Sequence, residues 1–283
     1  MPKPRPKPQA RGLATGLRAA RKATDLTSTA VGTQLGWSQS TVSRIETGKR
    51  NASPDEVIAM LALYGVKGPE RERLLSMARD ADRSTWLETH QDRITNQAVT
   101  LTEYESEAVE LTLFQLVLIP GLLQTVSYTR AMMNAGGVSA ANIEPRVQQR
   151  ADRQRVLDTA NPPQVLAIID EAVLHRRIGG KRVMAEQLRH LLTMADRPNI
   201  DLRVIPFDHG GHSGINGAFF LARFEKDRPI VHVENLRSGL FLDDPADVGP
   251  YEVAIASMTA IALDPSASAE MVEEALGRYE RSE

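Results

Sequence analysis

Apolar residues recur every three to four positions through the first 80 residues, which is the spacing of amphipathic helices. Hydroxyl residues that can begin a helix precede three of these runs, at Thr27, Ser38 and Ser53. Glycines that can end a helix follow them, at Gly36, Gly48 and Gly65. The pattern predicts five short helices, over Leu13–Ala23, Ser28–Leu35, Ser38–Glu46, Pro54–Tyr64 and Gly68–Arg79.

The pattern changes beyond residue 100, where helical periods mix with β-branched runs. Helices are predicted over Leu101–Phe114, Ser127–Asn134, Ala140–Asp158, Lys181–Ala195, Pro245–Ala262 and Ser266–Tyr279. Strands are predicted over Val165–Ile169, Asp201–Ile205, Phe219–Phe224 and Ile230–Val233. The expected fold is therefore multidomain: an all-α five-helix bundle followed by an α+β or α/β domain whose strand order stays open.

A chain of 283 residues suits about two domains. We expect a flexible basic arm over 1–10, where Pro alternates with basic residues, and the helical bundle over 11–80. A helical linker over 81–99 and a regulatory domain over 100–283 complete the expected organisation. The arm could lie along phosphates or enter a minor groove, or it could be a tail without a role.

The net charge of −2 hides an asymmetry. The first 53 residues hold 10 basic and 2 acidic residues, which gives +8, so the other 230 carry 24 − 34 = −10. A basic head on an acidic body favours binding of a polyanion, although a chance cluster of solvated charges is the alternative.

The absence of cysteine excludes disulfides, thiolate metal sites and a cysteine nucleophile. No run of apolar residues is long enough for a membrane span, and no export signal begins the chain. We expect a cytoplasmic, nucleoid-associated protein with no membrane partner and no cofactor.

The second and third predicted helices have the parts of a helix-turn-helix, in which one helix inserts side chains among base edges of double-stranded DNA. Apolar residues that can clamp the two helices together stand at Val31, Leu35, Val42 and Ile45. The residues left pointing outward are Gln39, Ser40, Ser43 and Arg44. Gln favours adenine, Arg favours guanine and Ser bonds either base or phosphate, so we predict that these four read bases. The alternative is an ordinary solvated helix face.

The segment TSTAVGTQLGWSQSTVSRIETGK resembles the helix-turn-helix of phage-repressor-like (Xre-type) regulators, the group of the lambda and 434 repressors. The resemblance implies a structural ion pair between Arg21 and Glu46, and phosphate contacts after the recognition helix. The predicted phosphate-binding set is Thr27, Ser28, Ser38, Thr41, Thr47, Lys49, Arg50 and Asn51. Two positions depart from the family: Ser28 replaces a frequent Gln, and Gly32 replaces a small Ala, which should weaken that helix by up to ~1 kcal/mol.

A second resemblance lies beyond residue 100, and together with the first it covers nearly the whole chain. The runs that carry it are PGLLQTxxYxRA from Pro120, RxxRQ from Arg150, DEAxL from Asp170, QL from Gln187 and VxPF from Val204. They resemble the C-terminal domain of regulators abundant in Streptomyces and other actinomycetes. The resemblance implies an antitoxin-like regulator that is paired with a small acidic partner protein.

Other residues leave alternatives open. Asp208-His209-Gly210-Gly211-His212 could bind zinc or supply a general base, but no third ligand accompanies the histidines. Asp170 and Glu171 could be a carboxylate pair or could cap a helix. Four arginines could bind an acidic partner or form a solvated helix face: Arg146, Arg150, Arg153 and Arg155.

We therefore expect a repressor or activator that binds DNA as a homodimer and is not an enzyme. Its C-terminal domain should sense a partner protein or a small-molecule effector. A hydrolase-like enzyme with a DNA-binding head is the alternative.

Overall fold

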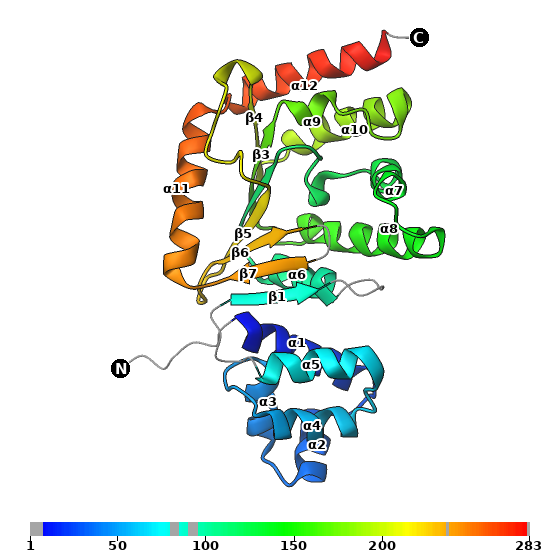
Figure 1. The fold of residues 1–283 in the computed structure, drawn as a ribbon, viewed down its shortest axis with the longest axis vertical. Helices are drawn as coiled ribbons and strands as arrows, with labels where there is room; N and C mark the ends of the chain where they lie inside the picture. The colour runs from blue at the N-terminus through cyan, green and yellow to red at the C-terminus, as the bar shows by residue number, and fades with distance from the viewer. Residues whose placement is uncertain (1–7, 80–84, 90–95, 236–237, 282–283) are drawn as a thin grey trace. The chain divides into compact units, whose positions relative to one another are not determined.

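The computed structural model describes residues 8–79, 85–89, 96–235 and 238–281. The chain forms two compact units (Figure 1). One comprises residues 1–87 and 240–244, and the other comprises residues 88–239 and 245–283.

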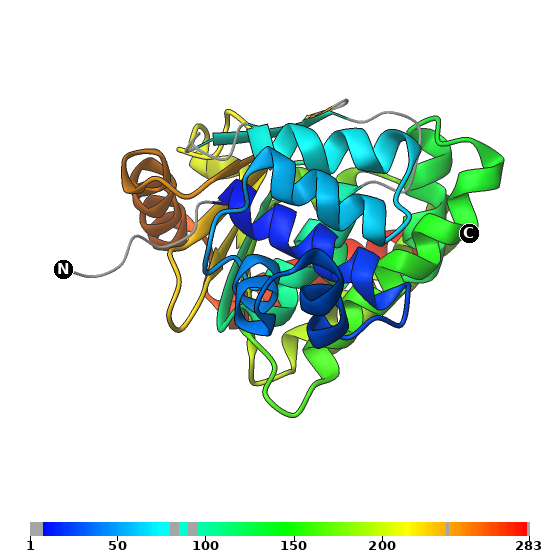
Figure 2. The same cartoon turned by 90° about the horizontal axis from the view of Figure 1, so that it is seen from below.

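The first unit contains the five predicted helices. They are α1 (Pro8–Lys22), α2 (Ser28–Leu35), α3 (Gln39–Glu46), α4 (Pro54–Leu63) and α5 (Gly68–Arg79). α5 lies beside α1 and α4, as Figure 2 shows from below. The apolar stripes of the helices meet in a core that includes Leu17, Val31, Val42, Val57, Met60 and Leu74.

Side chains at the helix starts satisfy backbone groups that the helices leave unpaired. The hydroxyl oxygens of Thr27 and Ser38 accept hydrogen bonds from the amides of Ala30 and Thr41, at 3.1 and 3.0 Å. Ser53 and Glu56 form a reciprocal capping box at the start of α4. These caps explain why the helix starts were predictable from single residues.

The second unit is an α+β domain. Its helices are α6 (Asn96–Glu107), α7 (Val126–Ala135), α8 (Ala140–Gln154), α9 (Ala172–His175), α10 (Gly180–Ala195), α11 (Pro245–Ile261) and α12 (Pro265–Glu280). The strands of the chain are β1 (Thr85–Thr89), β2 (Glu110–Gln115), β3 (Gln164–Asp170), β4 (Ile200–Ile205), β5 (Phe219–Arg223), β6 (Ile230–Glu234) and β7 (Ser238–Leu242).

The strands form one mixed sheet in the order β1-β7-β6-β5-β2-β3-β4. β3 is parallel to both of its neighbours, with Val165 opposite Leu111 of β2 and Ile200 of β4. β2 is antiparallel to β5, and β5 is antiparallel to β6. α11 lies on one side of this sheet and α7, α8 and α10 lie on the other (Figure 1). The strands are therefore covered on both faces, which explains their continuous apolar runs.

The helix predicted over Leu101–Phe114 is wrong in its second half. α6 ends at Glu107, and β2 begins at Glu110. Leu111, Leu113 and Phe114 are buried because β2 pairs with β3 on one edge and with β5 on the other. Pairing with distant segments overrides the local period here.

Among the described α-helices and strands, β1, β7 and the short helix α9 were also not predicted. The expected helical linker over 81–99 instead holds strand β1 and the start of α6, and its residues 81–84 and 90–95 lie outside the described ranges. Residues 1–7 of the expected arm also lie outside them, whereas Pro8 to Ala10 form the first turn of α1. Proline suits that position because the amide there needs no helical partner.

Two glutamines, one buried and one half-buried, hold the segment that connects β2 to α7. Gln187 of α10 is fully buried; its Oε1 accepts the amide of Thr125 at 2.7 Å, and its Nε2 donates to the carbonyl of Leu123 at 2.7 Å. Gln154 donates to the carbonyls of Gly121 and Gln124. The conformation of this connection therefore depends on side chains from two other helices.

Gln187→Ala should lower the free energy of unfolding by roughly 2 to 4 kcal/mol, because two buried backbone groups lose their partners. Urea denaturation followed by circular dichroism measures the change. Arg189→Gln, at an exposed position of the same helix, is the control and should stay within about 0.5 kcal/mol. Equal stabilities of the two variants would contradict the role given to Gln187.

Candidate nucleic-acid interface

α2 and α3 are joined by a tight turn that Gly36 makes possible. Gly36 has φ 70°, a left-handed conformation that favours glycine. The amide of Trp37 donates to the carbonyl of Gly32 at 2.8 Å and closes the end of α2. Trp37 itself is half-buried in the turn.

Gly32 has a packing role that helix propensity does not reveal. A Cβ atom built there would lie 2.8 Å from the carbonyl oxygen of Trp37 and 3.2 Å from the amide nitrogen of Gln39. The first distance is too short for a real contact with backbone. Glycine is expected to weaken α2. Because it has no side chain, it also lets α2 lie closer to the turn and to α3.

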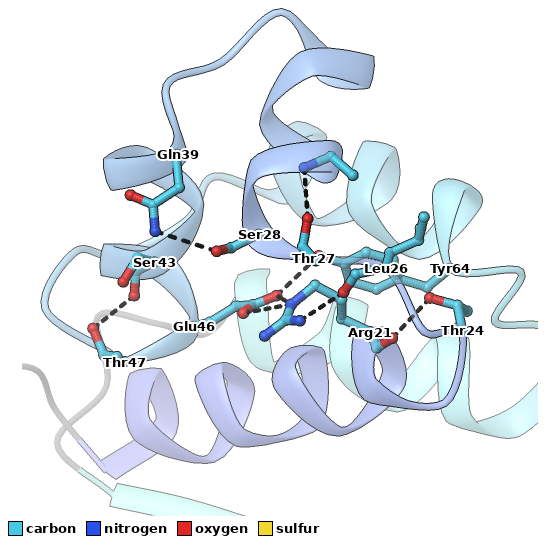
Figure 3. A network of polar contacts seen from close by, with 11 residues as sticks. Arg21, Thr24, Leu26, Thr27, Ser28, Gln39, Ser43, Glu46, Thr47 and Tyr64 are labelled. Carbon is cyan, nitrogen blue, oxygen red and sulfur yellow. Dashed lines mark hydrogen bonds and ion pairs between the residues drawn. The ribbon is translucent and has the colours of Figure 1, made fainter.

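The four residues predicted to read bases lie on α3, and three of them, Gln39, Ser40 and Arg44, are exposed. Ser43 is half-buried. Gln39 and Ser28 point toward one another from α3 and α2 (Figure 3), and Nε2 of Gln39 donates to the hydroxyl of Ser28 at 3.2 Å. This bond orients the amide of Gln39 and leaves its Oε1 and its second N–H available.

The hydroxyl groups predicted to contact phosphates already make local hydrogen bonds. Ser38 Oγ caps α3 and lies 2.8 Å from Ser40 Oγ and 2.9 Å from Thr41 Oγ1. Thr47 donates to the carbonyl of Ser43 at 2.7 Å. These bonds order the side chains. Ser38 Oγ also accepts the amide of Thr41, so its two lone pairs and its proton are all engaged, and Thr47 has donated its only proton to Ser43. A phosphate oxygen accepts hydrogen bonds, so either hydroxyl must turn its proton away from the local partner to bind one.

The polar residues after α3 differ in whether their side chains already have a partner. Lys49 and Asn51 are exposed. Arg50 instead donates Nη2 to Glu56 Oε1 at 2.7 Å, and its Nη1 is buried without an acceptor among the described residues. The sequence interpretation treated Glu56 only as part of a cap, so it missed this ion pair. The phosphate contact of Arg50 stays a prediction, and Lys49 is the freer cation.

Glu56 is held in its ionised form. Burial opposes ionisation, but the hydrogen bonds from Arg50 and from the amide of Ser53 outweigh it, so the pKa of Glu56 lies below its ordinary value. The carboxylate therefore stays available to both the arginine and the cap at neutral pH.

A buried carboxylate fixes α3 against its neighbours (Figure 3). Arg21 of α1 donates Nε to both carboxylate oxygens of Glu46 at 2.9 Å, and its Nη1 donates to the carbonyl of Leu26 at 2.7 Å. The hydroxyl of Tyr64 donates to Oε1 of Glu46 at 3.0 Å. Burial, together with the charge of Glu46, raises the pKa of Tyr64 well above its usual value, so Tyr64 remains a donor. The sequence interpretation named the ion pair but missed Tyr64, which it treated only as a helix end.

The two histidines that the sequence analysis singled out, His209 and His212, have different surroundings. His212 is buried against Asp170, with 3.3 Å between its Nε2 and Oδ2, and its Nδ1 accepts the amide of Gly214. His209 is exposed. Within the described ranges, no three His, Asp or Glu side chains gather where they could hold a metal ion. Oδ1 of Asp170 accepts the amide of Ala172 at 2.8 Å, the capping alternative that the sequence left open.

The arginines of α8 correct the interpretation of a solvated helix face. Arg153 is buried in a bidentate pair with Glu105 of α6, at 2.5 and 2.8 Å. Arg150 donates Nη1 to Gln124 Oε1 at 2.6 Å. Only Arg155, 77% exposed and paired with Asp152, fits a solvated face. The sequence signal that could have shown this is the spacing of Arg146, Arg150 and Arg153, which places them on one face of the helix.

Two family models match the chain. Residues 98–274, more than half of the chain, match the model of a domain of unknown function, DUF5753. Residues 13–74 match the model of a helix-turn-helix domain. No curated protein matches. The helix-turn-helix domain makes DNA binding the function of the first unit.

A solved structure gives a distant likeness. TrmBL2, an archaeal chromatin protein described as showing a novel mode of DNA binding, has a TM-score of 0.31 and 13% sequence identity. The match covers 69% of this chain and 60% of that chain, so the chain spans less than two thirds of TrmBL2. A similarity at this level carries no argument about function. Separately, none of the helices in the described ranges is long and apolar enough to cross a membrane.

Arg21→Ala should lower the free energy of unfolding of the helical unit by roughly 3 to 5 kcal/mol, because it leaves the buried Glu46 carboxylate without its cation. Arg18→Ala, at an exposed position of the same helix, should change it by less than about 0.5 kcal/mol. Chemical denaturation of each variant provides the comparison.

The double variant Arg21→Ala/Glu46→Gln tests the electrostatic cause, because it removes both charges. It should recover part of the lost stability. A double variant that is as unstable as the sum of the two single variants would show that packing, and not charge, stabilises this contact.

Proposed function

Because the chain belongs to the DUF5753 family and carries a helix-turn-helix domain, we propose that it is a sequence-specific transcriptional regulator that reads the major groove with α3. The observation that carries the proposal is the outer surface of α3, where Gln39, Ser40 and Arg44 are exposed while Val42, Ile45 and Glu46 are buried. A helix held on its inner side and polar on its outer side suits insertion among base edges.

Base reading is assigned to Gln39, Ser40, Ser43 and Arg44. Gln39 offers Oε1 and one N–H, the pair of groups that matches N6 and N7 of adenine. Arg44 has no ion pair among the described residues, so its guanidinium is available for guanine O6 and N7. Ser28 acts on this surface by holding the amide of Gln39.

Phosphate contacts are assigned to the hydroxyls and amides around the turn and to the residues after α3. Thr27, Ser38, Thr41 and Thr47 are ordered by local bonds. Lys49 and Asn51 are exposed where the chain leaves α3. Such contacts set the register on the duplex and carry no sequence information.

The finer family identity is also a proposal. The ion pair between Arg21 and Glu46 supports membership of the phage-repressor-like, Xre-type group. The resemblance of the second unit to actinomycete regulators supports an antitoxin-like role, with a small acidic protein or a small molecule as the signal.

Arg44→Ala should weaken binding of the operator by about 1 to 3 kcal/mol and relax the preference at one base pair. Lys49→Ala should weaken binding to all sequences alike and reduce the slope of log K against log salt by about 1. Fluorescence anisotropy with operator variants at several salt concentrations measures both effects. Arg155→Ala, exposed in the second unit, is the control.

Binding that ignores both substitutions would contradict the assignment of α3. Equal effects of Arg44→Ala on all sequences would move Arg44 from base reading to phosphate binding.

We also propose a homodimer, since one helix-turn-helix covers one half-site. Light scattering coupled to gel filtration, with and without a palindromic operator, should give twice the mass of the chain for the DNA-bound protein. A strictly monomeric protein in both conditions would overturn this part of the proposal and leave the assignment of α3 intact.

A further inference from the structure

Three arginines of α8 share one face of the helix, because they follow each other at four and three residues: Arg146, Arg150 and Arg153. Their surroundings differ. Glu105 neutralises Arg153 in a bidentate pair. Arg150 reaches only the neutral amide oxygen of Gln124, and Arg146 makes no side-chain hydrogen bond or ion pair within the described ranges.

Two hydrogen-bond donors on this face lack an acceptor. Nε of Arg146 and Nε of Arg150 are both buried and unpaired among the described residues. A buried donor without a partner costs about 1 to 3 kcal/mol, and more when it belongs to a charged group. Native structures rarely keep such groups without a reason, and an absent ion is one of the recognised reasons.

The charge of Arg150 is poorly compensated. Burial, with the neighbouring charge of Arg153, lowers the pKa of Arg150 to about 10, although Glu234 and Glu105 act in the opposite direction. Glu105 is paired with Arg153. No other carboxylate forms an ion pair with Arg150 in the part of the chain that the structure describes. An additional negative charge near Arg150 would therefore be stabilised.

Gly121 leaves room beside this guanidinium. A Cβ atom built at Gly121 would lie 3.8 Å from both Nε and Cζ of Arg150. Gly121 is not among the glycines with positive φ, so its backbone would accept another residue. The methyl group of an alanine at this position would lie in van der Waals contact with the guanidinium of Arg150.

We propose that Arg146 and Arg150 form a binding site for a small oxyanion, the phosphate or carboxylate group of a small molecule. Gln124 occupies Nη1 of Arg150, and Nη2 has no partner among the described residues, so Nη2 can donate a charge-assisted hydrogen bond to an oxygen of a carboxylate or phosphate. The site gives a chemical class to the effector of the second unit. It rests on the proposed function only for its regulatory purpose, because binding of the anion is measured without DNA.

The test is calorimetric titration of the full chain with inorganic phosphate and, separately, with acetate, in a buffer free of both and at constant ionic strength. We expect saturable binding of at least one anion, and the tighter of the two indicates the group that the effector carries. Arg150→Gln should weaken binding about tenfold or more, since it removes a charge-assisted bond. Gly121→Ala should weaken it without any change of charge.

Two controls make the result decisive. Arg155→Gln removes one positive charge from the same segment at an exposed position and should leave anion binding unchanged. Arg44→Ala should also leave it unchanged, because an anion on the DNA-binding surface would depend on Arg44. If Arg150→Gln does not fold, Arg150→Lys and Gly121→Ala carry the test.

The proposal is overturned if neither anion binds saturably, if Gly121→Ala and the Arg150 variants bind as well as the unchanged protein, or if Arg44→Ala abolishes the signal. Loss of operator binding in Arg44→Ala with retained anion binding would leave the two proposals separately supported.

Discussion

The helical unit depends on a carboxylate that has been removed from water. Glu46 on the inner face of α3 is only 5% exposed, and an isolated charge there would be very costly. Arg21 from α1 and Tyr64 at the end of α4 neutralise it and hydrogen-bond it, so three segments that are distant in the sequence must meet at one point. Because this contact sets how α3 is turned about its axis, it also decides which side chains of α3 face outward.

The helical unit was predictable because its signals are local. Thr27, Ser38 and Ser53 begin helices by bonding the amides three residues further on, so each start can be found from a short run of sequence. β2 was not predictable in this way, because its strand character comes from β3 and β5, which lie far along the chain. The individual residues of the candidate site were named from the sequence, but the bonds that orient them, from Ser28 to Gln39 and from Glu56 to Arg50, depend on tertiary structure.

The arginines of α8 show that charged residues on a polar helix need not lie at the surface. Arginines spaced along a polar helix are usually solvated, and the sequence offers no sign of what they meet. In the structure, Arg153 forms an ion pair with Glu105, and Arg150 donates a hydrogen bond to Gln124. Glu105 and Gln124 belong to segments that pack against α8. These polar contacts surround the connection after β2, which is held by the half-buried Gln154 of α8 and the buried Gln187 of α10. The polar core of this unit is thus organised around a loop.

The bond between Ser28 and Gln39 means that the outward surface of α3 is partly controlled from α2. A longer amide at position 28 would turn or compete for the side chain of Gln39, and a residue without a hydroxyl would release it. Under the proposed base contact of Gln39, two related proteins with the same α3 sequence but different residues at position 28 would prefer different operators. DNA specificity would then diverge through a residue of α2 that touches no base.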